Sequence, residues 1–276
     1  MHTNLPLDKR VAELLENRLA LYNRPSFIEH DPIFVPHQFS RKEDREIAAF
    51  LTATIAWGNR KSIVQSSLRI MQLMDNSPAD FILGFSETDL RSFRGFVHRT
   101  FSETDLVTFC FALKNIYEKH GGMEAVFYEG AKQWDPGNPG HGSSPVKTAI
   151  EHFRNIFFSI PHPKRSRKHV SDPGSGSASK RLNMMLRWLV RKDEVGVDLG
   201  IWTRFSASVL YCPLDVHSGR VARSLGLLQR KQNDWKAVEE LTARLRLLDP
   251  ADPVKYDFAL FGMGVFEKLK HPGRRF

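Results

Sequence analysis

The spacing of apolar and polar residues along the chain predicts helices almost throughout. In residues 8–22, Val11, Leu14, Leu15 and Leu19 recur at intervals of three and four, which places them on one face of a helix. No stretch keeps the alternation typical of a half-buried strand, and no internal repeat is evident. The predicted helices cover residues 8–22, 44–56, 61–74, 78–83, 102–119, 123–133, 146–159, 180–190, 200–210, 215–225, 234–247 and 253–268.

Local signals mark the start of several helices. Asp8 is placed to cap the first one, and Ser40–Glu43 has the pattern of a capping box, Ser followed three residues later by Glu. Ser86 and Ser102 each open a Ser-Glu-Thr-Asp sequence and are predicted helix starts as well. Stretches rich in Pro, Gly or basic residues predict loops at 23–39, 135–145 and 161–179.

These elements predict an all-α fold. With 276 residues, of which 41% are hydrophobic, the chain can bury the core of one large domain or two small ones. We expect residues 1–45 to form one helical lobe with residues 200–276, to which the chain returns at its end. Residues 46–199 are expected to form the second lobe, which ends in a basic loop and the helix opened by Lys180.

The net charge of the chain indicates what kind of partner it could bind. Forty Lys and Arg residues oppose 31 Asp and Glu residues, which gives a formal net charge of +9. Such an excess favours a polyanionic partner, because each basic side chain near a phosphate releases counterions. The alternative is a mildly basic protein without any such partner.

Cysteine and histidine usage indicates neither a metal site nor a cofactor. Cys110 lies in an apolar run and is expected to be a buried thiol, and Cys212 belongs to no metal-binding pattern, as in a reducing cytosol. His162, His169 and His217 lack a ligand spacing. No apolar stretch approaches the roughly 20 residues that a membrane span needs. We therefore expect a cytoplasmic protein with no membrane partner.

Residues 161–179 combine dense positive charge with small residues ahead of a predicted helix. Arg165, Arg167 and Lys168 are expected to contact phosphates. The small residues at 174–179 would let backbone N–H groups approach a phosphate at the positive end of the helix dipole. The alternative is a solvated, disordered loop.

Lys180 and Asp215 each allow two interpretations. Lys180 lies in a first helical turn, where the dipole opposes a cation and favours the neutral amine that a nucleophile requires; a solvated surface lysine is the alternative. Asp215 follows an apolar run and a proline near a helix start, where an N-cap role would suffice. His217 is either a core histidine or a phosphate contact, and Arg220 and Arg223 are expected on a solvated face.

Together, Gly176–Lys180 and Leu214–His217 resemble two elements of the helix-hairpin-helix DNA glycosylase (HhH-GPD) superfamily. In that family a Gly-x-Gly-x-Lys hairpin opens a helix, and an apolar Val-Asp-x-His segment follows. The wide gap between the two elements is similar to that of the archaeal 8-oxoguanine glycosylase branch. Weaker similarity extends over most of the chain. We expect the sequence to belong to a bacterial subfamily of unknown function within this superfamily.

The resemblance implies a two-lobed fold with a cleft and a DNA repair glycosylase with AP lyase activity. Lys180 would attack the sugar carbon of a flipped damaged base, here an oxidised purine, and form a Schiff base. Asp215 would be the essential carboxylate that stabilises positive charge on the sugar, and Asp257 would be structural. DNA contacts are expected from Trp57, Asn59, Arg60, Arg165, Arg167, Lys168, Gly176, Ser177, Ser179 and His217.

Two other functions fit the same residues. The first is a DNA- or RNA-binding protein on the same fold without catalysis, in which Lys180 is replaceable. The second is an interaction protein whose basic loop contacts an acidic protein, which predicts no steep salt dependence on DNA. The expected partner is double-stranded DNA on the nucleoid, with no cofactor and no obligatory protein partner.

Overall fold

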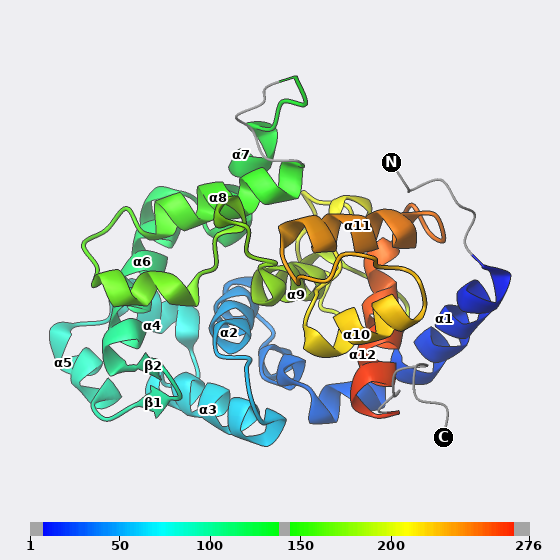
Figure 1. Ribbon diagram of the computed structural model, residues 1–276. Helices are drawn as coiled ribbons and strands as arrows, with labels where there is room; N and C mark the ends of the chain where they lie inside the picture. Colours follow the sequence, from blue (N-terminus) through cyan, green and yellow to red (C-terminus); the bar gives the residue numbers. More distant parts are fainter. Residues whose placement is uncertain (1–7, 138–143, 268–276) are drawn as a thin grey trace. The chain divides into compact units, whose positions relative to one another are not determined.

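The computed structural model describes residues 8–137 and 144–267, and these residues are mostly helical (Figure 1). The all-α prediction is confirmed. None of the described helices is both long and apolar enough to cross a membrane. The α-helices are α1 (Lys9–Tyr22), α2 (Lys42–Thr54), α3 (Arg60–Leu73), α4 (Pro78–Gly84), α5 (Glu87–Leu90), α6 (Glu103–Lys119), α7 (Met123–Lys132), α8 (Pro145–Phe157), α9 (Lys180–Val190), α10 (Val216–Ser224), α11 (Trp235–Arg246) and α12 (Asp257–Val265). The 3-10 helices are η1 (Pro25–His30), η2 (Pro32–Phe34), η3 (Pro36–Gln38), η4 (Arg91–Phe93), η5 (Lys164–His169), η6 (Pro173–Ser175), η7 (Ala207–Val209) and η8 (Pro253–Tyr256).

Three predicted features are wrong. An antiparallel hairpin of β1 (Val97–His98) and β2 (Phe101–Ser102) stands where no strand was predicted, because strands of two residues are too short to show alternation. Of residues 200–210, predicted as a helix, only η7 is helical. The capping box predicted at Ser40 is absent, since α2 has Arg41 as its N-cap residue and no side-chain cap.

Other helix starts are confirmed by their hydrogen bonds. The Asp8 carboxylate accepts the N–H of Arg10 at 2.9 Å. At α5 the Ser86 hydroxyl accepts the N–H of Asp89 at 3.4 Å, and at α6 the N–H and hydroxyl of Ser102 both donate to a carboxylate at 2.9 Å. These caps join residues two or three positions apart, which is why the local sequence predicts them.

Packing divides the chain into two compact units. Of the described residues, unit 1 contains 8–27 together with 175–267, and unit 2 contains 28–137 and 144–174. The sequence-based divisions were placed after residues 45 and 199. In the packed structure α9, with Lys180 at its start, belongs to the same unit as α10, α11 and α12.

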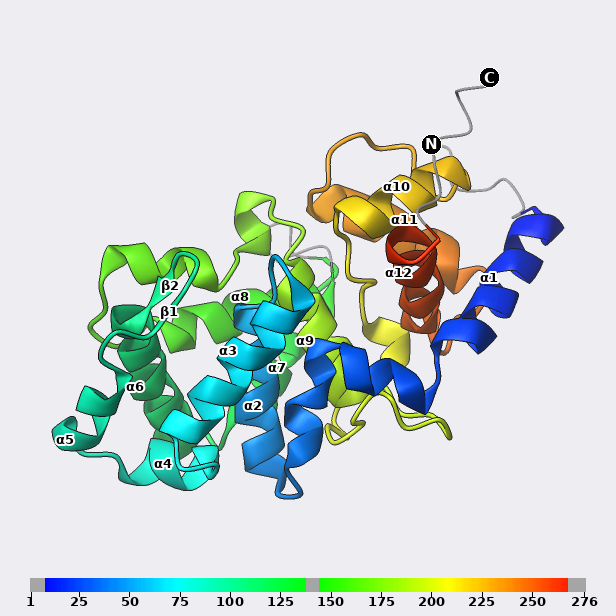
Figure 2. The same ribbon diagram turned by 90° about the horizontal axis from the view of Figure 1, so that it is seen from below.

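In unit 1, α12 is the central helix, and both α1 and α10 pack against it (Figures 1 and 2). Phe258, Leu260 and Met263 of α12 are fully buried. Gly262 allows close approach of α1, because a Cβ at this position would collide with the ring of Tyr22. This packing fixes α12, whose first residue contributes to the candidate site.

In unit 2, an aromatic core surrounds α2. The ring of Phe50 on α2 stacks on Phe109 of α6, with 5.5 Å between centroids, and meets Phe153 and Phe157 of α8 edge-on. α7 and α8 approach closely at Gly130, where a Cβ would lie 2.9 Å from Cα of α8 residue Ala149. The aromatic core supports the surface segments described below.

Candidate functional site

Lys180 is the first residue of α9 and follows a tight turn of the backbone. Ser179, the N-cap residue, has left-handed backbone angles (φ 46°, ψ 38°), and no side chain caps the helix there. The first turn of α9 also contains no acidic residue. Backbone N–H groups at a helix start without a side-chain cap are suited to an anion, which the helix dipole also favours.

The amine of Lys180 has little to bind. Its Nζ lies 3.4 Å from Sδ of Met184, one turn further along α9, and a thioether is only a weak acceptor. The side chain is half-buried. Within residues 8–137 and 144–267 the amine forms no ion pair.

Asp215 is the N-cap residue of α10, and only one of its carboxylate oxygens is used in that role. Oδ1 accepts the N–H groups of His217 and Ser218 at 2.7 and 2.9 Å, and the Ser218 hydroxyl at 3.2 Å. In the described part of the chain, Oδ2 accepts no hydrogen bond. The N-cap interpretation is confirmed, and it leaves one oxygen available for a ligand. The His217 side chain is exposed beside it.

Asp257 is a carboxylate on which the charges of both Lys180 and Asp215 act. It begins α12, is buried, and places Oδ2 against Nη1 of Arg187. Burial raises the pKa of Asp257 to about 6, while the positive charges of Arg187 and Lys180 lower it and the negative charge of Asp215 raises it. Because Lys180 and Asp215 each influence Asp257, these three residues of unit 1 are called here the Lys180 cluster.

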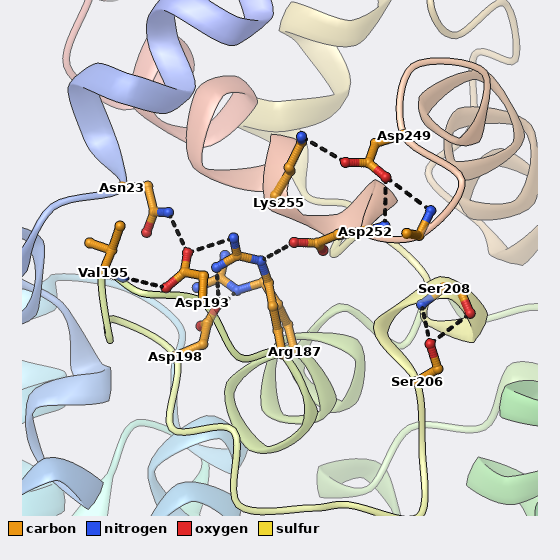
Figure 3. Close-up of polar contacts among 12 residues, drawn as sticks. Asn23, Arg187, Asp193, Val195, Asp198, Ser206, Ser208, Asp249, Asp252 and Lys255 are labelled. Atoms are coloured by element: carbon orange, nitrogen blue, oxygen red, sulfur yellow. Dashed lines mark hydrogen bonds and ion pairs between the residues drawn. The ribbon is translucent and has the colours of Figure 1, made fainter.

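Buried ion pairs hold α9, the helix that begins with Lys180, against its neighbours in unit 1. Arg187 also binds Oδ1 of Asp198 at 3.2 Å, and its guanidinium lies 4.2 Å from the ring centre of Phe258 on α12. One turn further on, Arg191 binds Asp198 at 3.0 Å. Figure 3 shows Asp198, Asp252 and Asp193 of this network. Asp252 lies 2.8 Å from Arg191, and Asp193 binds Arg191 and also accepts a hydrogen bond of 2.7 Å from Asn23. The network ties α9 to α12 and to the end of α1.

The backbone before α9, residues 176–179, is an ordered segment. The carbonyl of Gly176 accepts a hydrogen bond of 3.0 Å from the first residue of α11, and Ser177 pairs with Asp234 in an antiparallel bridge. The Asn183 side-chain amide donates to the carbonyl of Ala178 at 3.1 Å. Carbonyl groups of this segment are thus engaged by the protein. The predicted phosphate contacts of Gly176, Ser177 and Ser179 remain predictions.

The turn before α3 carries three other predicted DNA contacts, all in unit 2. Trp57 is half-buried and stacks on His169 with 6.1 Å between ring centroids. Asn59 is exposed, and its Oδ1 caps α3 by accepting the N–H of Ser62 at 3.3 Å. Arg60 is the half-buried first residue of α3. The packing of Trp57 explains its conformation without a ligand, and its role in DNA binding stays a prediction.

The basic run, residues 164–168 of the predicted loop 161–179, was expected to bind phosphates or to be disordered. In the structure a buried carboxylate, that of Asp105, holds it in place. Asp105 accepts the hydroxyl of Ser166 at 2.7 Å and Nη2 of Arg165 at 3.2 Å. The guanidinium of Arg167 lies 5.5 Å from the ring centre of Phe158. Arg165 and Arg167 therefore have structural contacts in addition to their charge. Lys168 is exposed and has no ion pair within the described residues.

Replacing Asp105 with alanine is expected to lower the free energy of unfolding by about 2–4 kcal/mol, because the variant loses a helix cap and leaves buried donors unsatisfied. Burial raises the pKa of Asp105, but the hydrogen bonds from Ser166 and Ser102 together lower it by more than burial raises it. The pKa of this carboxyl therefore lies below its ordinary value. The contribution of Asp105 is therefore lost as the pH falls through that lowered pKa.

Urea titration at neutral pH measures the Asp105→Ala effect. The matched control is Asp89→Ala, which removes the corresponding capping box at the exposed start of α5 and should cost about 1 kcal/mol. Equal losses in the two variants would show that Asp105 serves only as a cap and does not order the basic run.

Sequence reasoning assigned Asp257 a structural role only and gave Arg187 and Arg191 none. Arg187 and Arg191 are four residues apart, so they share one face of α9 and bind Asp198 together. Two cations at that spacing beside an apolar helix face were a usable signal for buried carboxylates. The residues that supply them lie up to 70 positions away, as Asp257 does from Arg187.

Comparison with known proteins shows the family. One family model, described as a protein of unknown function (DUF2400), matches residues 31–266. The chain therefore belongs to the DUF2400 family. No curated protein and no solved structure is significantly similar to it.

The predicted membership of the helix-hairpin-helix DNA glycosylase superfamily is wrong. The family match is to DUF2400, and nothing in the comparisons indicates the glycosylase superfamily. The resemblance rested on two short segments, a lysine at a helix start and an aspartate at another. The structure shows that Asp215 is an N-cap, which is a common use of aspartate in any helical protein. Any function must therefore be argued from the site itself.

Proposed function

We propose that this protein acts on DNA through the amine of Lys180, as a DNA glycosylase with AP lyase activity on a damaged base. The observation that supports the proposal is the position of that amine: half-buried, without an ion pair in the described residues, and in the same electrostatic cluster as two carboxylates. The net charge of +9 favours a polyanionic substrate. Such an activity would place the protein on the nucleoid.

Each member of the Lys180 cluster has a task in the proposed reaction. The Lys180 nitrogen bonds to the sugar carbon C1′ as the bond from C1′ to the base breaks, and the base leaves with a proton. Oδ2 of Asp215, which accepts no hydrogen bond in the described residues, faces the positive charge that grows on the sugar. The proton lost by the amine passes to a carboxylate of the cluster and from there to the departing base. The C1′–O4′ bond then breaks as the nitrogen lone pair forms the C=N bond, and O4′ takes up a proton from water. The resulting protonated Schiff base permits strand cleavage, in which a C2′ proton and the 3′-phosphate are lost by elimination.

Borohydride trapping tests this proposal. Purified protein is mixed with duplex oligonucleotides that carry 8-oxoguanine or an abasic site, and a Schiff base is reduced to a covalent adduct. We expect an adduct with the wild type and loss of the adduct to background with Lys180→Gln. The control is Lys231→Gln, which removes an exposed lysine of the same unit and should leave the adduct unchanged.

An adduct that survives Lys180→Gln would overturn the assignment of the nucleophile. No adduct on either substrate, with salt-dependent DNA binding retained, would favour the second candidate, a nucleic-acid-binding protein without catalysis. The observation that favours this candidate is the start of α9, which has neither a side-chain cap nor an acidic residue in its first turn.

A further inference from the structure

The tip of the β1–β2 hairpin holds an arginine in a disfavoured backbone conformation. Arg99 has φ 55°, in the left-handed region, and its side chain is exposed. The other described non-glycine residues with positive φ are Asp75, Asn76 and Ser179, whose short polar side chains suit this region better. The two-residue turn of the hairpin accounts for the positive φ, and arginine is an uncommon residue for that position.

The Arg99 side chain lies across the turn before α3. Gly58 has φ 105°, and a Cβ at this position would lie 2.5 Å from Nε and 2.8 Å from Cζ of Arg99. Because Gly58 has no side chain, the guanidinium of Arg99 can pack directly on this turn. The next residue of the turn, Asn59, is exposed. His98, next to Arg99, anchors the hairpin to α3 through a hydrogen bond of 2.8 Å between Nδ1 and the Ser66 hydroxyl. Figure 1 shows the hairpin beside α3.

A third segment, η5, contacts the tip of the hairpin. Nη2 of Arg165 donates to the carbonyl of Thr100 at 3.2 Å, which links η5 to the hairpin tip. We call residues 57–61, 97–102 and 164–168 the hairpin surface. Its exposed cations that form no ion pair within the described part of the chain are Lys61, Arg99, Lys164, Arg167 and Lys168.

Two carboxylates lie next to these segments, and neither forms an ion pair with Arg99 or with the exposed lysines of the hairpin surface. Asp105 is buried beneath the basic run, where it binds Arg165 and Ser166. Glu103 accepts the N–H of Gly95 at 2.8 Å. The exposed positive charge is therefore not balanced by acidic groups of these segments.

We infer that the hairpin surface binds the sugar–phosphate backbone of duplex DNA, with Arg99 as its central phosphate contact. The inference deepens the proposed function and rests on it for the choice of DNA. An exposed guanidinium backed by a rigid turn can meet a phosphate with two parallel hydrogen bonds, and neighbouring lysines add unpaired charge. Such contacts position a duplex without reading its sequence. The surface belongs to unit 2 and is distinct from the Lys180 cluster of unit 1.

The salt dependence of DNA binding tests this inference. The dissociation constant of the full-length protein for a fluorescent duplex oligonucleotide is measured between 50 and 300 mM KCl. Arg99→Asn is the test variant, because asparagine tolerates the left-handed backbone and should preserve the fold. Each phosphate contact contributes about 0.9 to the slope of log K against log salt, so the variant should lose about 1 unit of slope.

The matched control is Lys119→Gln. Lys119 is exposed, forms no ion pair in the described residues, and ends the 17-residue helix α6, about 25 Å from its start beside the hairpin. This control should keep the wild-type slope. A wild-type slope in Arg99→Asn, with its melting temperature unchanged, would overturn the inference, as would wild-type binding to DNA that does not depend on salt.

The two proposals fail separately. If Arg99→Asn lowers the slope but no wild-type adduct is trapped by borohydride, the hairpin surface stands and the Lys180 chemistry does not. If the adduct forms and needs Lys180 but Arg99→Asn binds DNA as the wild type does, the chemistry stands and the hairpin surface is overturned. If the hairpin surface binds an acidic protein instead of DNA, Arg99→Asn should bind DNA as the wild type does, while the Lys180-dependent adduct still forms.

Discussion

Replacing Arg187 with alanine is expected to lower the free energy of unfolding by about 3–5 kcal/mol. The guanidinium is buried and joins Asp198 and Asp257, which are also buried. Its removal leaves two carboxylates in a region of low polarity with fewer positive charges, and it removes the packing of the guanidinium over Phe258. Because Asp257 belongs to the Lys180 cluster, trapping activity should fall as well.

Urea titration of the full chain, followed by tryptophan fluorescence, measures this loss. The control is Arg18→Ala, which removes a partly exposed ion pair with Glu267 in the same unit. That variant should lose no more than about 1 kcal/mol. Similar losses in the two variants would show that the buried network adds nothing beyond a surface pair.

The Arg187→Ala effect should depend on pH. Burial raises the pKa of Asp257 to about 6, and the charge of Arg187 is the largest influence that lowers it, so the variant should have a still higher pKa at this carboxyl. A group whose pKa is raised in the folded state favours folding when protonated, and this contribution is lost as the pH rises through that pKa. The difference from the wild type should therefore be largest above pH 6 and shrink in acid.

Replacing Asp215 with asparagine is expected to slow borohydride trapping by about 100-fold or more while leaving stability within about 0.5 kcal/mol of the wild type. Asparagine caps a helix as well as aspartate does, so Oδ1 can still accept the N–H groups of His217 and Ser218. The negative charge proposed to stabilise the sugar cation is lost. The substitution thus separates the observed capping role from the proposed chemical one.

A matched control for the Asp215 variant is Asp8→Asn at the start of α1. Asp8 also caps a helix of unit 1, by accepting the N–H of Arg10 at 2.9 Å, but it lies outside the Lys180 cluster. Trapping rates should be unchanged in this variant. A trapping rate in Asp215→Asn equal to that of the wild type would leave Asp215 as a helix cap only.

Local interactions set the starts of the helices, whereas long-range packing sets the buried ion pairs. Asp8, Ser86, Ser102 and Asp215 were all predicted helix starts and all cap helices, because a cap binds N–H groups two or three residues away. The same local pattern was wrong at Ser40, where it occurs without the capping hydrogen bonds.

The sequence by itself determined the helical class, most helix boundaries, and the placement of Lys180 and Asp215 at helix starts, since all of these follow from spacings within one or two turns. Only the tertiary structure decided the rest. It brought Asp257 to Arg187 across 70 positions and Asp105 to Arg165 across 60, and it placed Arg99 against Gly58. Charged groups this far apart in the chain meet only when packing brings their helices and loops together, so no local pattern reveals which of them become partners.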